Sequence, residues 1–210
     1  MQIELKNVKP KYMSEAEVKA SDIYLQLRVV FEKGKKYLIK ANSGHGKTSI
    51  LNFIYGNNLN FEGEIKYDTS FEGKKVFDYR KRNISYVFQD FKLFPELTLF
   101  ENIQLKNKLT NFKTEKEIEE LIKRVQLLEK KDQLVKNFSL GQRQRIAIIR
   151  ALCQSFDFLL LDEPFSHLDS ENIEILTKII DEELENRNAS LIMTSLGEVS
   201  FFKYNCVLNL

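Results

Sequence analysis

The apolar run in FDFLLLDEP, residues 156–164, constrains the fold more than any other feature, because Phe158–Leu161 contains no polar side chain. A strand with one buried face alternates apolar and polar residues, whereas a strand in a parallel sheet is covered on both faces by helices. We therefore expect an α/β protein in which this run forms a buried parallel strand.

The rest of the chain fits such a sheet. Two capping boxes, Thr114 with Glu117 and Ser139 with Gln142, each predict the start of a helix, and the pattern is helical from about residue 95. We expect an α/β core with a helical insertion near residues 90 to 150. Further predicted helices cover residues 48–55 and 170–185, and predicted strands cover residues 3–8, 23–31, 35–41, 61–68, 189–195 and 205–210.

Size and composition exclude several classes of protein. A length of 210 residues allows one or two domains, and charged residues, 30% of the chain, leave a formal charge of only +2. This balance argues against a nucleic-acid binder or a polybasic membrane anchor. Cys153 and Cys206 form neither a metal-ligand spacing nor a disulfide framework. With no apolar run near the ~18 residues of a membrane span and no signal-peptide core, we expect a cytosolic protein.

Residues 41–48, ANSGHGKT, lie between a predicted strand and a predicted helix and nearly match the phosphate-binding pattern G-x-x-x-x-G-K-[ST]. Backbone N–H groups of such a loop surround an anion, and the dipole of the following helix adds to the attraction. Lys47 would neutralise phosphate oxygens, and Thr48 would offer its hydroxyl to Mg²⁺. Ala41 stands in place of the first glycine. An alanine is tolerable at this position if its φ stays negative. The predicted nucleotide contacts are Asn42, Ser43, Gly44, His45, Gly46, Lys47, Thr48 and Ser49.

Two carboxylates, Asp162 and Glu163, follow the buried strand directly. In open α/β sheets ligands bind at the carboxyl edge, where the loop after another strand would also lie. Asp162 would hold Mg²⁺ through water, and Glu163 would take a proton from an attacking water. Taken alone, the pair could equally be two solvated acids at the end of a strand.

Five segments in this order, ANSGHGKT, VFQD, FSLGQRQRIAIIRAL, FLLLDEP and SHLD, resemble the motifs of the nucleotide-binding subunit of ATP-binding cassette (ABC) transporters. The resemblance covers nearly the whole chain. It implies a P-loop NTPase core with an N-terminal antiparallel β subdomain and an inserted helical subdomain, in one domain of residues 1–210. Residues 1–89 and 153–210 would form the core, and about 90–152 the helical subdomain.

The resemblance also implies roles for residues within one subunit. Gln89 would touch Mg²⁺ and sense the γ-phosphate of ATP, Glu163 would be the general base, and Lys47 would also take part in catalysis. An aromatic residue near the N-terminus would stack on adenine, for which Tyr12 is the candidate. The alternative for Tyr12 is a strand aromatic packed within the β region.

Other implied roles need a second subunit. Ser139 and Gly141, together with Gln142, would contact the γ-phosphate of the ATP held by the other protomer, and Asp169 would cross the dimer interface. From the residues alone, Ser139 caps a helix whose free N–H groups and dipole favour an anion. The alternative for Ser139 is a plain helix cap.

Besides Ala41, two residues depart from the family pattern. Leu140 replaces a glycine of the signature, usually written LSGGQ, and Ser195 stands where the family places a switch histidine. A serine hydroxyl is shorter and cannot carry positive charge near pH 7, although it could bond the γ-phosphate through a water. Since Glu163 is present, we expect hydrolysis to persist but to be slow or strongly dependent on a partner.

The leading functional hypothesis is an ATPase subunit that forms a homo- or heterodimer and drives a separate membrane permease, at the inner face of the cell membrane. It predicts neither nucleic-acid binding nor direct membrane insertion. The alternatives are a soluble cassette of the iron–sulfur-assembly type and a slow or non-hydrolysing ATP sensor. Transport direction and substrate stay open. The apolar residues that could meet the permease, or instead pack in the helical subdomain, are Phe91, Leu93, Phe94, Leu97 and Phe100.

Overall fold

A five-stranded parallel sheet forms the centre of the protein. The computed structural model describes residues 1–42, 46–67, 76–196 and 200–210. Every neighbouring pair of strands in this sheet is parallel, which confirms the predicted α/β class. The spatial order of the strands is β5 (Ile84–Val87), β6 (Phe158–Asp162), β7 (Ser190–Ser195), β3 (Lys36–Lys40) and β8 (Cys206–Asn209).

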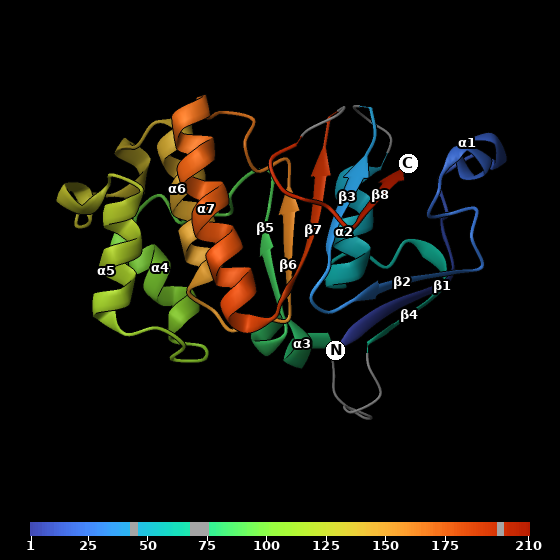
Figure 1. The fold of residues 1–210 in the computed structure, drawn as a ribbon, viewed down its shortest axis with the longest axis horizontal. Helices are drawn as coiled ribbons and strands as arrows, with labels where there is room; N and C mark the ends of the chain where they lie inside the picture. The colour runs from blue at the N-terminus through green and yellow to red at the C-terminus, as the bar shows by residue number, and fades with distance from the viewer. Residues whose placement is uncertain (43–45, 68–75, 197–199) are drawn as a thin grey trace.

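Strand β6 is buried on both faces, as its apolar run predicts. Leu159 and Leu161 belong to the core that helices α6 and α7 share, whereas Phe158 and Leu160 belong to the core around helix α2. Figure 1 shows α6 and α7 on one side of the sheet and α2 on the other. These helices are α2 (Lys47–Tyr55), α6 (Leu140–Leu152) and α7 (Ser170–Arg187).

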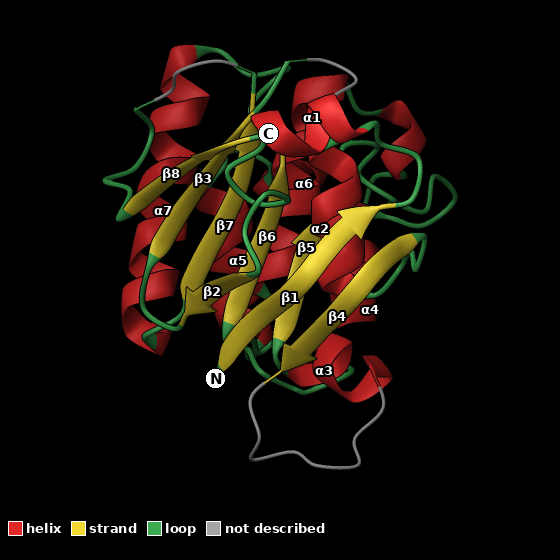
Figure 2. Ribbon diagram, turned by 90° about the vertical axis from the view of Figure 1, so that its right-hand side faces the viewer, coloured by secondary structure: helices red, strands yellow, loops and turns green. Residues whose placement is uncertain are grey.

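A second, antiparallel sheet has the order β2-β1-β4 and includes the N-terminal strand. Figure 2 looks onto it, with the strands of the parallel sheet behind. Its buried residues share a core with α2, so the second sheet covers this helix from outside. The antiparallel β subdomain implied by the family resemblance is thereby confirmed. Its strands are β1 (Gln2–Pro10), β2 (Arg28–Glu32) and β4 (Phe61–Tyr67).

Helices fill the segment between β5 and β6. The capping boxes of Thr114 and Ser139 both form as predicted, at the starts of α5 and α6. We propose this group as the helical subdomain, with boundaries at about residues 90 and 152. Its members besides α6 are α4 (Leu99–Asn107), α5 (Glu115–Arg124) and two short 3₁₀ helices, Leu128–Lys130 and Val135–Asn137.

The strand predicted at residues 23–31 begins later than expected, at Arg28. The Ser21 hydroxyl accepts hydrogen bonds from the backbone N–H groups of Ile23 and Tyr24, at 3.1 and 3.0 Å. These bonds offer the backbone an alternative to a sheet ladder and turn the chain. Both apolar side chains are buried all the same, which explains why the composition resembled that of a strand.

Two short helices were not predicted from the sequence. Helix α1 (Glu15–Ala20) buries no residue, so it lacks the apolar periodicity that identifies helices. Its signal was the capping box between Ser14 and Glu17. The second is α3 (Val76–Arg82), which precedes β5.

Gly63 is required by the pairing of β1 with β4. Its φ is +88°, and a Cβ at this position would lie 2.3 Å from the carbonyl oxygen of Asn7 and 2.4 Å from that of Lys6. The register of the two strands shifts between Lys6 and Lys9, so β1 has a bulge here. Only glycine combines this φ with such a close approach of two backbones.

We expect Gly63→Ala to lower the free energy of unfolding by about 2 kcal/mol or more, because it adds both backbone strain and a clash. Urea denaturation would measure the loss, with Glu64→Ala on the same strand as the control. A loss below about 0.5 kcal/mol, the range of ordinary surface substitutions, would contradict this account of the bulge.

Candidate functional site

Several predicted site residues lie at the carboxyl edge of the parallel sheet. Strand β7 pairs with β6 on one side and with β3 on the other, so the residues that follow all three strands are neighbours. Ala41 follows β3, and its N–H donates to the carbonyl oxygen of Ser195 at 3.4 Å. The φ of Ala41 is not positive, which is the condition under which alanine can replace the first glycine of the loop.

Lys47 joins the phosphate loop to the carboxylate pair. It is the first residue of α2, and it is buried. Its Nζ donates to the carbonyl oxygens of Ala41 and Asn42 at 2.8 and 2.9 Å, and it lies 3.3 Å from Oε1 of Glu163. These three acceptors match the three donors of an ammonium group. The structure therefore brings the predicted phosphate lysine and the predicted general base into contact.

A cavity of about 280 Å³ opens beside Lys47. Its wall is made by the turn after β1, the start of α2, the turn after β5 and the end of β6, four segments far apart in the sequence. All the lining residues among those that the structure describes are predicted site residues. They are Tyr12, Gly46, Lys47, Thr48, Ser49, Gln89 and Glu163.

Tyr12 lies at the phosphate loop. Its side chain is 52% exposed, and a Cβ on Gly46 would lie 3.8 Å from its hydroxyl oxygen. The alternative of a tyrosine packed inside the β region does not fit this exposure. Ser43, Gly44 and His45 lie outside the described residues.

Asp162 offers a buried carboxylate oxygen at the edge of the site. The side chain is 1% exposed, and its Oδ1 accepts a hydrogen bond from the Thr194 hydroxyl at 2.7 Å. Its Oδ2 is buried and has no hydrogen-bond partner among the described residues. Burial raises the pKa of Asp162, while Thr194 acts in the opposite direction. An unpartnered carboxylate oxygen is a ligand that suits Mg²⁺, so the residues here fit such an ion.

Glu163 has a left-handed backbone, with a φ of +47°. This conformation is uncommon for a residue with a Cβ and is costly unless neighbours hold it. The Glu163 N–H donates to the Thr194 hydroxyl oxygen at 3.2 Å, and the Gln144 side chain approaches its carbonyl oxygen at 3.4 Å. The strain is thus maintained from β7 and from α6, and it sets where the carboxylate points.

Gln144 is a residue of the site that the sequence analysis missed. It is 1% exposed, and its Oε1 accepts from the His167 N–H at 3.1 Å. Together with its approach to Glu163, this contact ties α6 to the segment after β6. The available signal was a polar residue among the inward-facing positions of the helix after Ser139.

The residues predicted to act on a second subunit lie outside the lining of the cavity. Ser139 and Gln142 cap α6 by exchanging hydrogen bonds at 3.3 and 3.0 Å, and Asp169 caps α7 through the Asn172 N–H at 2.9 Å. A Cβ on Gly141 would lie 2.8 Å from the carbonyl oxygen of His167, so these two helix starts are adjacent. Within one chain, Ser139 and Asp169 therefore serve as exposed helix caps.

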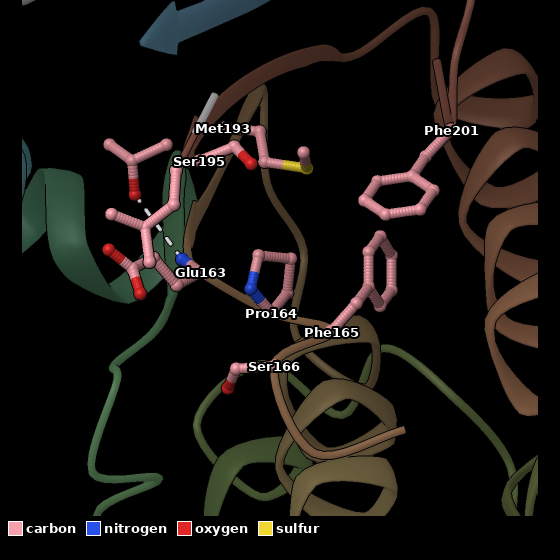
Figure 3. A pocket seen from close by; sticks show the side chains of 9 residues that line it. Glu163, Pro164, Phe165, Ser166, Met193, Ser195 and Phe201 are labelled. Carbon is pink, nitrogen blue, oxygen red and sulfur yellow. Dashed lines mark hydrogen bonds between the residues drawn. The ribbon is translucent and has the colours of Figure 1, made fainter. Parts of the chain in front are cut away.

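Ser195 lies beside Glu163 in a neighbouring cavity of about 190 Å³ (Figure 3). The serine is 8% exposed, and the far wall is apolar. Phe165 and Phe201 meet edge to face there, with ring centroids 4.9 Å apart. The short serine side chain thus adjoins free space next to the predicted base.

Comparison with known proteins agrees with this geometry. A family model described as ABC transporter matches residues 24–166. The chain belongs to the ABC transporter family. It has the fold of an ABC nucleotide-binding cassette: the ATP-binding cassette MJ0796, in a dimeric post-hydrolysis state bound to ADP and Pi, is 27% identical with a TM-score of 0.74, over 95% of this chain and 89% of that one.

Two curated relatives of this ABC cassette are named as import ATP-binding proteins. The glucose import protein GlcV of Saccharolobus solfataricus is 32% identical over 96% of this chain and 58% of its own length. The Fe(3+) ions import protein FbpC of Fusobacterium nucleatum is 37% identical over 76% of this chain and 43% of its own. The chain therefore spans about half the length of these relatives.

The raised pKa of Asp162 predicts how stability varies with pH. The folded state binds this proton more tightly than the unfolded chain, so the charged carboxylate lowers the free energy of unfolding. The penalty grows as pH rises from about 4 through the raised pKa, and it is fully present above that pKa. Asp162→Asn removes the charge but keeps an oxygen for Thr194.

Without divalent cations, we expect Asp162→Asn to raise the Tm by about 2 °C or more near pH 7.5, and by less near pH 4, where the carboxyl group of the folded protein is largely protonated. Thermal denaturation at the two pH values would measure both differences. An unchanged or lower Tm near pH 7.5 would show that burial of this charge is not costly.

Proposed function

We propose that this ABC cassette binds and hydrolyses ATP and drives a separate integral-membrane permease. The proposal rests on one observation above all: Lys47, Thr48, Gln89 and Glu163 line a single cavity beside buried Asp162. These are the groups that phosphoryl transfer to water requires. They are a cation that binds the phosphate, hydroxyl and carboxylate ligands for a metal, and a base.

In this mechanism the phosphates of ATP bind at the N-terminus of α2, where free N–H groups and the helix dipole favour anions. Tyr12 stacks on the adenine, and Asn42, Ser43, Gly44, His45, Gly46 and Ser49 surround the phosphates. Mg²⁺, when bound, neutralises charge on the phosphate oxygens, and Thr48, Gln89 and Asp162 would hold it.

The base must be freed before it can act. Phosphate oxygens compete with Glu163 for Lys47, which the carboxylate contacts at 3.3 Å. Once released, Glu163 accepts a proton from the attacking water, while Lys47 stabilises charge on the transferring phosphoryl group.

A second cassette completes the site in this proposal. Four residues lie outside the cavity of their own chain and are at least partly exposed, namely Ser139, Gly141, Gln142 and Asp169. They can therefore act on ATP held by a partner cassette. The free N–H groups at the start of α6 would face the γ-phosphate there. The partner can be a second copy or a different cassette.

Phe94 is the best candidate for contact with the permease. It is 54% exposed, whereas Phe91 is buried and Leu93, Leu97 and Phe100 are partly buried. Packing within the helical subdomain therefore accounts for most of this apolar segment, but not for Phe94. Among the described residues, no helix combines the length and the apolar character of a membrane span. We propose that the cassette lies at the inner face of the cell membrane through its permease.

The relatives that are named as import proteins do not share one transported substrate. GlcV and FbpC are named for glucose and for Fe(3+) ions, which share no chemistry that one site could recognise. The cavity of this cassette suits a nucleotide. Substrate choice therefore belongs to the permease and its associated proteins.

Glu163→Gln tests the proposed mechanism of ATP hydrolysis directly. We expect phosphate release from Mg-ATP to fall by about 100-fold or more, because the amide cannot accept the proton of the attacking water. ATP binding should persist, and size-exclusion chromatography should show an ATP-dependent dimer. Undiminished release would exclude Glu163 as the base. ATP binding without release by the unaltered protein, even with a permease added, would instead support an ATP sensor.

Ser195→His tests whether the serine limits the rate. The adjoining cavity of about 190 Å³ leaves room for an imidazole beside Glu163. We expect phosphate release by the assembled complex to rise by about tenfold or more, since imidazole can carry a positive charge near pH 7. Ser195→Asn is the matched control, because asparagine resembles histidine in shape but cannot carry that charge. Equal rates for all three proteins would refute this idea.

A further inference from the structure

The turn after Gln89 has an unusual backbone. Phe91 and Lys92 have φ values of +63° and +47°, so two consecutive residues with a Cβ are left-handed. Such residues are uncommon singly, and they persist only where the surroundings hold them. The turn connects Gln89, which lines the nucleotide cavity, to the exposed Phe94.

Arg150 holds this turn from α6. Its guanidinium donates from one nitrogen to the carbonyl oxygen of Phe91 and from the other to that of Lys92, both at 2.7 Å. The planar fork of arginine suits two neighbouring acceptors in a way that a lysine ammonium does not.

Among the described residues, the charged guanidinium of Arg150 has these two carbonyl groups, and no carboxylate, as its partners. The side chain is 7% exposed, and no carboxylate of the described chain lies within ion-pair distance of it. Burial lowers the pKa of Arg150 to about 10, so it remains charged at neutral pH. A buried cation is costly unless polar groups surround it, and the two carbonyl groups provide that. The contact is therefore favourable for both the arginine and the turn.

Asn102 of α4 fixes the other end of the turn. This residue is fully buried. Its Nδ2 donates to the carbonyl oxygen of Phe94 at 3.0 Å, and its Oδ1 accepts from the Phe94 N–H at 2.9 Å. The backbone between Gln89 and Phe94 is thus held by one buried side chain from each of two helices.

We propose that Arg150 is a positioning residue that sets the place of Gln89 in the nucleotide cavity through the left-handed turn at Phe91 and Lys92. The same helix begins next to Ser139 and ends at Leu152, so one rigid element carries both Ser139 and the guanidinium. The effect of Arg150 on hydrolysis rests on the function proposed for Gln89; its effect on the turn does not.

The matched control is Arg187 of α7. Its guanidinium also donates to two main-chain carbonyl oxygens, those of Gln154 and Leu152, at 2.8 Å each. Its other contacts are an ion pair with Glu183 of the same helix and the rings of Phe112 and Phe156, and none of these residues belongs to the turn after Gln89. Arg187→Lys therefore measures the general effect on the fold of losing a buried arginine that donates to two carbonyl groups away from this turn.

Hydrogen exchange followed by mass spectrometry, with no nucleotide added, tests the turn itself. We expect Arg150→Lys to speed exchange of the amides in residues 89–94 by about tenfold or more, because the turn loses its fork of donors. Arg187→Lys should leave this segment unchanged. Faster exchange in both variants, or in neither, would overturn the proposal.

A double-mutant cycle with Gln89→Ala tests the route of action. We expect Arg150→Lys to lower kcat for Mg-ATP by about tenfold with KM within about twofold, and to have almost no further effect in Gln89→Ala. Additive losses would show that Arg150 does not act through Gln89. If the unaltered protein has no turnover even with a permease added, the proposed function fails, and the exchange result alone decides whether Arg150 holds the turn.

Discussion

Parallel pairing of β7 with both β6 and β3 determines where every group of the candidate site lies. Parallel strands end at the same edge, so one register places Ala41, Glu163 and Ser195 together although they lie far apart in the sequence. This pairing in turn depends on helices covering both faces of the sheet. The alternating membership of β6 residues in two cores shows that it is covered in this way.

The site itself is held by Thr194 of the central strand. Its hydroxyl donates to Oδ1 of Asp162 at 2.7 Å and accepts from the Glu163 N–H at 3.2 Å. One side chain therefore offsets part of the cost of the buried charge and supports a strained backbone. A hydroxyl can do both because it is a donor and an acceptor at once. Such strain and desolvation are found together where function, rather than stability, sets the geometry.

Local sequence patterns predicted the sheet, the two capping boxes and the phosphate loop with its carboxylate pair, whereas Gln89 and Tyr12 followed only from the family resemblance. Apolar runs and Gly-rich turns depend on local physics, so they can be recognised one segment at a time. The turn at residues 22–27 escaped because Ile23 and Tyr24 are buried without being in a strand, and the Ser21 bonds that bend the chain leave no periodic pattern. Gln144 and Arg150 escaped for a related reason: their partners are backbone groups brought close only by tertiary packing.

The contact between Lys47 and Glu163 gives the departure at Ser195 a physical meaning. A cation at position 195 would be a second positive partner for the Glu163 carboxylate, and it would also attract phosphate. Serine is neutral, so Lys47 is the only residue in ion-pair distance of Glu163 among those that the structure describes. In the proposed mechanism the phosphates of ATP must then both engage Lys47 and leave Glu163 without a cation to orient it. The base would be placed by its backbone conformation, while its side chain would have no cation to orient it. This agrees with our expectation that hydrolysis depends on a partner.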